Sequence, residues 1–264
     1  MKIAYFIKKT ALANDARIEA VLRALESGGA QVCRLSAADR PDPASDMLIS
    51  FGGDGTFLSA AVVAHDCGVP VLGINLGRMG FLAGAGIEGL AGHILSGDYC
   101  IEERQMICAS GHYALNEVSL CRVGAYTVGV DVEVDGNALP TYWADGLLVA
   151  TTSGSTAYNL SVGGPICMPG SKVFVISPIA PHNLGVRPLV IPDSSMVRLT
   201  VKSRHGGAVF SCDNRVMEVP DGFSVDLRLA DKPLKCVTIG DSNFIDALRN
   251  RFFWGQDVRN TTEQ

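Results

Sequence analysis

The sequence has few charged residues and no concentrated run of basic ones. Charged side chains make up 19% of the 264 residues, and the formal net charge at pH 7 is −5. A protein that binds nucleic acid normally carries a basic patch or stripe, and no Lys/Arg run occurs here. We therefore expect no nucleic-acid partner, although backbone dipoles can still hold a small polyanion.

Paired cysteines are absent as well. The eight cysteines are scattered singly, most of them inside apolar runs, and none forms a Cys-x-x-Cys pair. Clustered cysteines are the usual sign of a zinc site or a disulfide framework. The pattern instead indicates buried thiols in a reducing compartment, and we predict no metal-ligating side chains.

Long apolar runs are missing too. The stretch from Ile3 to Ile7 is too short for a signal peptide, and no later run approaches the roughly 20 apolar residues of a membrane-spanning helix. We expect a soluble, cytoplasmic protein with no membrane partner.

Two common catalytic motifs do not occur. The Gly-x-x-x-x-Gly-Lys-Ser/Thr motif of ordinary P-loop enzymes is absent, and Ser155 lacks the Gly-x-Ser-x-Gly context of a hydrolase nucleophile. The segment 84–89 has dinucleotide-binding Gly-x-Gly-x-x-Gly spacing, but no clear strand precedes it and no hydrophobic helix pattern follows. We interpret that match as accidental.

Apolar residues and glycines are plentiful, at 47% and 29 residues, so the chain can bury a sizeable core. In the first third, apolar runs alternate with helical patterns. A helix begins after Asn14 and Asp15 and stops at Gly28-Gly29, and another is predicted from Thr56 to about Cys67. The strands are predicted at residues 3–7, 31–35, 47–51 and 69–74. This alternation predicts a Rossmann-like α/β domain with a parallel sheet.

From about residue 100 the pattern becomes mainly β. Strand-like runs are separated by turn signals such as Asp135-Gly136-Asn137. They lie at residues 117–122, 127–134, 147–151, 172–177, 196–201, 225–229 and 236–239. We predict an α/β domain over 1–97, a β-rich domain over 98–242, and a helical tail over 243–264 that packs back on the first domain.

The loop Gly52-Gly53-Asp54-Gly55-Thr56 follows an apolar strand and precedes a helix. Its amides therefore lie at a helix N-terminus, where phosphate groups are readily bound, and the glycines permit close approach. A carboxylate in such a loop would weaken phosphate binding unless it has another task. Asp54 is a candidate general base or magnesium ligand, or it only caps the helix.

Two further polar clusters interrupt apolar runs. Asn116-Glu117 lies at the start of a strand, where polar side chains need partners if they are buried. From Asp145 to Pro165 a strand ends in a hydroxyl-rich loop, followed by a short helical stretch and a glycine pair. This segment either lines a pocket for a ribose or purine edge or is a polar crossover that caps its own helix.

Together these segments resemble the NAD kinases. The resemblance extends over nearly the whole chain, and the segment 145–165 is its most specific part, because Gly-Gly-Asp-Gly-Thr also occurs in diacylglycerol kinases and, in a variant, in phosphofructokinases. The matching segments are Gly52–Thr56, Gly73–Leu82, Asn116-Glu117, Asp145–Pro165, Ser177–His182, Arg187–Leu189, Leu248-Arg249 and Trp254-Gly255.

The resemblance implies transfer of the γ-phosphate of ATP to the 2′-hydroxyl of the adenosine ribose of NAD, forming NADP. It also implies Mg²⁺ or another divalent cation bound with ATP, and a homodimer or homotetramer. Asp54 would be the catalytic base, with Gly52, Gly53, Gly55 and Thr56 holding phosphate. The NAD-binding residues implied are Asp54, Gly55, Phe81, Asn116, Glu117, Asp145, Ser153, Thr156, Ala157, Tyr158 and Ser161.

One departure and two alternatives remain. After a strand at 208–211, members of the family usually carry Asp, a small residue and Gln, whereas here Asp213-Asn214 is followed by Arg215. A lipid or sugar kinase with the same glycine-aspartate loop is one alternative, although in lipid kinases the Asn-Glu pair follows the loop almost at once. A catalytically silent nucleotide-binding regulator is the other.

Overall fold

The computed structural model describes the whole chain except residues 37–38, 78–79, 205, 241–243 and 253–264. Two compact units make up the fold. The first comprises residues 1–102 together with 235–264, and the second comprises residues 103–234. Among the described residues, no helix is both long enough and apolar enough to cross a membrane.

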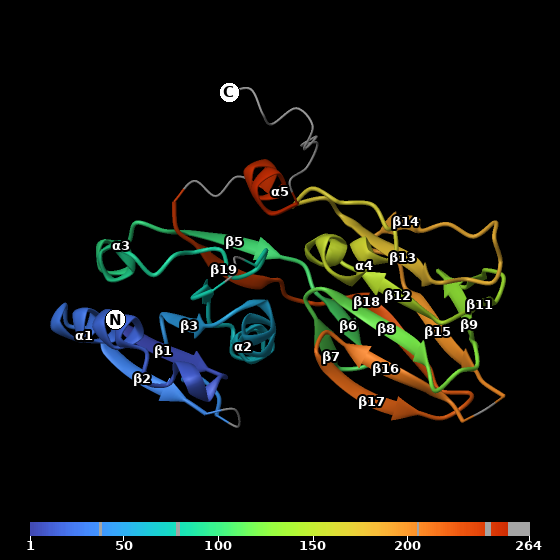
Figure 1. Ribbon diagram of the computed structural model, residues 1–264, viewed down its shortest axis with the longest axis horizontal. Coiled ribbons are helices and arrows are strands. Elements are labelled where there is room, and N and C mark those ends of the chain that lie inside the picture. The colour runs from blue at the N-terminus through green and yellow to red at the C-terminus, as the bar shows by residue number, and fades with distance from the viewer. Residues whose placement is uncertain (37–38, 78–79, 205, 241–243, 253–264) are drawn as a thin grey trace, which may run out of the picture. The chain divides into compact units, whose positions relative to one another are not determined.

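The first unit is built on a single six-stranded sheet of order β2-β1-β3-β4-β19-β5 (Figure 1). The pairs from β2 to β19 are all parallel, which confirms the predicted α/β unit with a parallel sheet. The strands are β1 (Lys2–Ile7), β2 (Gln31–Leu35), β3 (Met47–Phe51), β4 (Val71–Ile74), β5 (Cys100–Arg104) and β19 (Leu234–Thr238).

Helices cover both faces of this sheet. On one face, α1 (Ala16–Ser27) and α3 (Leu90–Ser96) bury apolar side chains against β3 and β4. On the other face lies α2 (Asp54–Cys67), whose Phe57 ring packs so closely on Gly73 that a Cβ there would meet it at 2.7 Å. Side chains of a strand alternate between the two faces of a sheet, so β3 contributes buried side chains to both layers.

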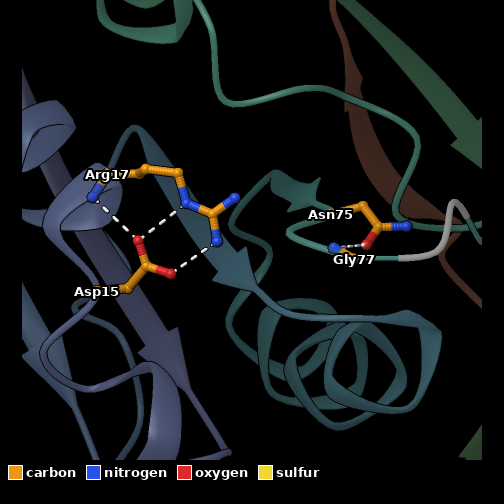
Figure 2. Close-up of polar contacts among 4 residues, drawn as sticks. All are labelled: Asp15, Arg17, Asn75 and Gly77. Atoms are coloured by element: carbon orange, nitrogen blue, oxygen red, sulfur yellow. Dashed lines mark hydrogen bonds and ion pairs between the residues drawn. The ribbon is translucent and has the colours of Figure 1, made fainter.

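The predicted start of the first helix is confirmed at Asp15. Its carboxylate accepts the Arg17 N–H at 2.9 Å and also binds the Arg17 guanidinium, as Figure 2 shows. Figure 2 also shows the turn after β4, where the Asn75 side chain accepts the Gly77 N–H at 2.9 Å. Both contacts satisfy backbone donors at the point where an element begins or ends.

Three sequence expectations about this unit were wrong or incomplete. The run 236–239 was assigned to the β-rich domain, but β19 pairs in parallel with β4 in the first sheet. Sequence order cannot reveal this, because a parallel partner can come from any distance along the chain. The helix α3 was missed because it is only two turns long, and β5 was missed because its side chains are mostly exposed and show no alternation.

The second unit contains two antiparallel sheets (Figure 1). One has the order β10-β9-β15-β18-β6-β7 with β11 beside β9, and the other has the order β14-β13-β12-β8-β16-β17. Their strands are β6 (Ile107–Ala109), β7 (His112–Ala114), β8 (Glu117–Arg122), β9 (Val128–Val134), β10 (Asn137–Ala138), β11 (Tyr142–Ala144), β12 (Gly146–Ala150), β13 (Val173–Ile179), β14 (Leu189–Pro192), β15 (Val197–Lys202), β16 (Ala208–Cys212), β17 (Arg215–Val219) and β18 (Ser224–Leu229).

The inner faces of the two sheets share one apolar core. Alternate residues of β8, β9 and β15 point into it, including Leu120, Val130 and Leu199. This is the pattern of a β-sandwich, and it confirms the predicted mainly β second half. The predicted strands shift by at most one or two residues, because alternation fixes a strand more firmly than its ends.

The outer face of the second sheet is covered by the segment that follows β12. This segment forms the short helices η2 (Ser153–Thr156) and α4 (Tyr158–Ser161), and Val162 packs with Leu148 and Ala150. The remaining helices are η1 (Thr10–Leu12) and α5 (Phe244–Phe252), and α5 provides the predicted C-terminal helix.

Candidate functional site

The glycine-aspartate loop has the predicted strand-loop-helix geometry. β3 ends at Phe51, Gly53 is the N-cap residue, and α2 begins at Asp54. The N–H groups of Thr56 and Phe57 return to the Gly53 carbonyl at 2.9 and 3.1 Å, which forms the first turn. A Cβ at Gly53 or Gly55 would meet nothing within 4 Å, so this side of the turn is open to a ligand. The loop thus presents a helix N-terminus at which Gly53 and Gly55 have no side chains of their own.

Asp54 does not cap its own helix. Its carboxylate turns to the segment after β4, where Oδ1 accepts the N–H groups of Leu82 and Ala83 at 3.2 and 3.0 Å. Oδ2 accepts the Phe81 N–H at 2.9 Å. A carboxylate offers about four lone-pair positions, so the described residues leave one position unused, on Oδ2. The Asp54 side chain is therefore fixed in orientation and can still accept one more proton or hydrogen bond.

Gly80 makes this arrangement possible. A Cβ at Gly80 would lie 1.9 Å from Asp54 Oδ1, far inside van der Waals contact. Only glycine lets the backbone approach the carboxylate so closely. The segment 80–83 therefore belongs to the site through its backbone, whereas the sequence analysis had assigned only the Phe81 side chain to it.

Asn116 and Glu117 lie at the start of β8 in the second unit. Asn116 is 7% exposed, yet its Oδ1 has no hydrogen-bond partner among the described residues, and Glu117 Oε2 is also buried without one there. Burial raises the pKa of Glu117 from 4.5 to about 7, with the charge of Asp213 adding and a hydrogen bond from the Tyr158 N–H opposing. Two buried acceptors without donors are costly in a folded chain unless a ligand supplies the donors.

Asp145 precedes β12 and is held by an ion pair. Its Oδ1 lies 2.7 Å from Arg122 Nε, and both side chains are partly exposed. Burial raises the pKa of the Tyr158 phenol, with the neighbouring Cys121, Asp145 and Glu117 adding to the shift. Asp145 and Glu117 are therefore both close enough to the Tyr158 phenol to act on its charge. Arg122, which fixes Asp145, was not singled out from the sequence.

The hydroxyl-rich segment after β12 has an inner and an outer side. On the inner side, Ser155 and Asn159 are fully buried and bond within the chain, with Ser177 Oγ donating to Asn159 Oδ1 at 2.7 Å. On the outer side are the partly or fully exposed residues Ser153, Thr156, Ala157, Tyr158 and Ser161. The buried hydroxyls thus stabilise the loop, although no side chain caps η2 or α4, and the accessible residues remain predicted contacts of a nucleotide.

The predicted residues thus form two groups. Gly52, Gly53, Asp54, Gly55, Thr56 and Phe81 meet in the first unit, around the Asp54 carboxylate. Asn116, Glu117, Asp145 and the 153–161 segment meet in the second unit, on the outer face of β8 and β12. Within the part of the chain that is described, no three His, Cys, Asp or Glu side chains gather as a set of metal ligands.

The segments that contain these two groups of residues match two domains of one protein family. Residues 27–96 match the ATP-NAD kinase N-terminal domain, and residues 115–239 match the ATP-NAD kinase C-terminal domain. The chain belongs to the NAD kinase family. The NAD kinase of Flavobacterium psychrophilum is 39% identical, over 83% of this chain and 79% of that protein. The NAD kinase of Bacteroides fragilis is 37% identical, over 98% of this chain and all (100%) of that protein.

Solved structures agree with this assignment. An NAD kinase from Archaeoglobus fulgidus in complex with ATP superimposes with a TM-score of 0.77 at 27% identity, covering 96% of this chain and 98% of that one. Yeast NADH kinase complexed with NADH gives a TM-score of 0.83 at 21% identity, covering 99% and 90%. At that lower identity the likeness shows the fold alone.

Proposed function

We propose that this member of the NAD kinase family transfers the γ-phosphate of ATP to the 2′-hydroxyl of the adenosine ribose of NAD, forming NADP. The observation that carries the proposal is the Asp54 carboxylate, which three backbone N–H groups orient and whose Oδ2 keeps one acceptor position. A base for a hydroxyl needs this combination of fixed direction and remaining acceptor capacity. Asp54 lies in the first turn of α2, and the N-terminus of a helix favours phosphate.

The donor side of the reaction uses the loop Gly52–Thr56. Its open face and its place at the start of α2 support binding of the ATP phosphates there. Mg²⁺ commonly binds with substrate phosphates, so it would enter with ATP and be held there by the ATP phosphates. The cation supplies neutralisation of charge on the phosphates in phosphoryl transfer.

The acceptor side uses the second group of residues. Asn116 and Glu117 offer the buried oxygens without donors, and the hydroxyl and amino groups of NAD can supply these. Asp145, held by Arg122, adds a fixed carboxylate. Ser153, Thr156, Ala157, Tyr158 and Ser161 provide the accessible side of the neighbouring segment, and Phe81 is proposed as an apolar contact of the dinucleotide.

The chemical step then assigns one role to Asp54. Oδ2 accepts the proton of the 2′-hydroxyl as that oxygen attacks the γ-phosphorus, while Oδ1 stays bound to Leu82 and Ala83. ADP leaves with the electron pair of the broken P–O bond. Most of the rate then comes from positioning and from charge neutralisation, as in other phosphoryl transfers.

We also propose a cytoplasmic location and a homodimer or homotetramer. The eight cysteines all lie in the described part of the chain and form no disulfide there, which fits a reducing compartment. Size-exclusion chromatography with light scattering measures the mass of the assembly, and a purely monomeric mass at assay concentration would remove the second proposal.

The direct test is product formation. Purified protein with ATP, Mg²⁺ and NAD should form a product that an NADP-specific dehydrogenase reduces, whereas diacylglycerol or a hexose phosphate in place of NAD should give none. Asp66→Asn is the matched control for Asp54→Asn, because Asp66 lies in the last turn of the same helix and pairs with Arg40. A folded wild-type protein that binds NAD and forms no NADP would favour the silent regulator.

A further inference from the structure

We propose that Asp213 is a positioning residue of the NAD site, which fixes the backbone of Leu115, Asn116 and Glu117 so that the two acceptor side chains meet the dinucleotide. The inference rests on the proposed function, since it assigns Asn116 and Glu117 to NAD. Asp213 itself contacts the protein backbone and has no part in the phosphoryl-transfer step.

The first observation is the set of contacts that the Asp213 carboxylate makes. Oδ2 accepts the Leu115 N–H at 2.8 Å, and Oδ1 accepts the N–H groups of Asn116 and Glu117 at 2.8 and 3.2 Å. The Asp213 N–H in turn donates to the Glu117 carbonyl at 2.9 Å. Hydrogen bonds to an ionised acceptor are stronger than neutral ones, so this side chain holds three consecutive residues in place.

The second observation is that the same segment is held from its other side. Thr151 Oγ1 donates to the Leu115 carbonyl at 2.5 Å, and the Thr151 N–H donates to the Asn116 carbonyl at 2.8 Å. Gly154 lies so close that a Cβ there would meet the Asn116 carbonyl oxygen at 2.1 Å. The N–H groups are thus held by one turn and the carbonyl groups by another, which leaves the backbone of 115–117 little freedom.

The third observation is what this fixed segment presents. The backbone N–H and carbonyl groups named above all have hydrogen-bond partners. In contrast, Asn116 Oδ1 and Glu117 Oε2 are buried and have no partner among the described residues. Native chains rarely bury a polar oxygen without a donor, and such groups occur where a ligand completes the bonding. A rigid backbone below two unsatisfied acceptors is the arrangement expected of a preorganised binding site.

Asp213 itself is held in an unusual backbone conformation. Its φ is 52°, in the tight turn that joins β16 to β17, and few residues other than glycine, asparagine and aspartate adopt this conformation readily. Arg215, two residues further along the chain, donates from Nη2 to the Tyr113 carbonyl, and this Nη2 lies 3.4 Å from Cys212 Sγ. Burial raises the pKa of the Asp213 carboxyl, and the N–H groups of residues 115–117 and then the charge of Arg215 act against this rise.

The test is Asp213→Asn, because asparagine tolerates the positive φ but has a single acceptor oxygen. Asp135→Asn is the matched control: Asp135 also has positive φ, at 51°, in a hairpin turn of the same unit, and its carboxylate accepts the Met196 N–H at 2.8 Å. We expect Asp213→Asn to raise the KM for NAD by about tenfold or more, with the KM for ATP within about twofold of wild type, whereas Asp135→Asn changes neither.

Amide hydrogen exchange provides a readout that is independent of turnover. The N–H groups of Leu115, Asn116 and Glu117 should exchange faster in Asp213→Asn and at the wild-type rate in Asp135→Asn. If Asp213→Asn fails to fold, Thr151→Val tests the segment from its other side, and Thr151→Ser, which keeps the hydroxyl, should restore the KM for NAD.

Two results would overturn the proposal. One is an Asp213→Asn protein with an unchanged KM for NAD and unchanged exchange at 115–117. The other is an equal rise in the KM values for NAD and ATP, which would indicate general destabilisation. A wild-type protein that binds NAD without forming NADP would reject the proposed function alone, since NAD affinity measured by titration would still decide the role of Asp213.

Discussion

Asp54 in the first unit and Asp213 in the second receive the same pattern of hydrogen bonds and differ in what surrounds them. In each, one carboxylate oxygen accepts two backbone N–H groups and the other accepts one, from residues 81–83 and 115–117 respectively. Asp54 lies at the start of α2 between Gly53 and Gly55, where an added Cβ would meet no described atom within 4 Å, whereas Asp213 lies in a tight hairpin turn beside Arg215.

The two aspartates use the same hydrogen-bond pattern for different purposes. At Asp54 the amides fix a carboxylate in the first turn of a helix, which suits a group that acts on a substrate. At Asp213 the carboxylate fixes the amides, and the groups left for a substrate are the side chains of the residues it holds. Hydrogen bonding alone therefore does not distinguish a reacting aspartate from a supporting one; the place of the carboxylate in the fold does.

The largest effect should come from Asp54→Asn. An amide cannot accept the hydroxyl proton, so we expect kcat to fall by about 10²- to 10⁴-fold. The KM for NAD should change little, because the residues proposed to bind NAD are otherwise intact. Steady-state rates of NADP formation measure both, with Asp66→Asn as the control. A loss confined to the KM for NAD would break the comparison by placing Asp54 in binding.

The next effect concerns Glu117 and pH. The folded protein holds this pKa at about 7 against an ordinary 4.5, so the folded state favours the protonated side chain. The stabilisation that Glu117 contributes is complete below pH 4.5 and is lost as pH rises through about 7. The loss amounts to roughly 3 kcal/mol in the free energy of unfolding. Denaturant unfolding at pH 5 and pH 8.5 should show this fall in wild type and a smaller one in Glu117→Gln. An identical pH dependence in the two proteins would contradict the assigned pKa.

Gly80→Ala should have an intermediate effect on the Asp54 side of the comparison. The added methyl group would lie 1.9 Å from Asp54 Oδ1, so the carboxylate or the 80–83 segment must move. We expect a loss of stability of about 1–3 kcal/mol and at least a roughly tenfold lower kcat. Gly77→Ala is the control, since a Cβ there would meet nothing within 4 Å. Equal activity of the two variants would show that the orientation of Asp54 does not depend on this close contact.

The smallest effect should come from Arg215→Gln, which changes the surroundings of Asp213. It removes a positive charge beside that carboxylate and weakens the bond to the Tyr113 carbonyl. We expect a loss of about 1–2 kcal/mol in the free energy of unfolding and a rise of about two- to fivefold in the KM for NAD. Denaturant titration and initial rates measure these changes. An unchanged KM would show that Asp213 holds the 115–117 segment without Arg215.

Periodicity and resemblance made most of this architecture predictable. The longer strands of the β-rich half follow from alternation, whereas the short or exposed β6, β7, β10, β11, β14 and β17 were not predicted. The loop at 52–56 follows from a strand, a glycine pair and a helix pattern. The strand at β19 was predicted but its sheet was not, because the choice of sheet depends on tertiary pairing rather than on local sequence. The role of Asp213 was also hidden, since the sequence identifies it only as an aspartate beside the unusual Arg215. Its three amide partners lie about 100 residues earlier in the chain, with separations of 96 to 98 residues.

A side-by-side kinetic analysis of wild type, Asp54→Asn and Asp213→Asn tests the central claim most directly. With ATP and Mg²⁺ fixed at saturation and NAD varied, wild type should form NADP, Asp54→Asn should lose kcat, and Asp213→Asn should raise the KM for NAD while keeping most of its kcat. The account would be contradicted if both variants changed the same kinetic parameter, or if the folded wild-type protein formed no NADP.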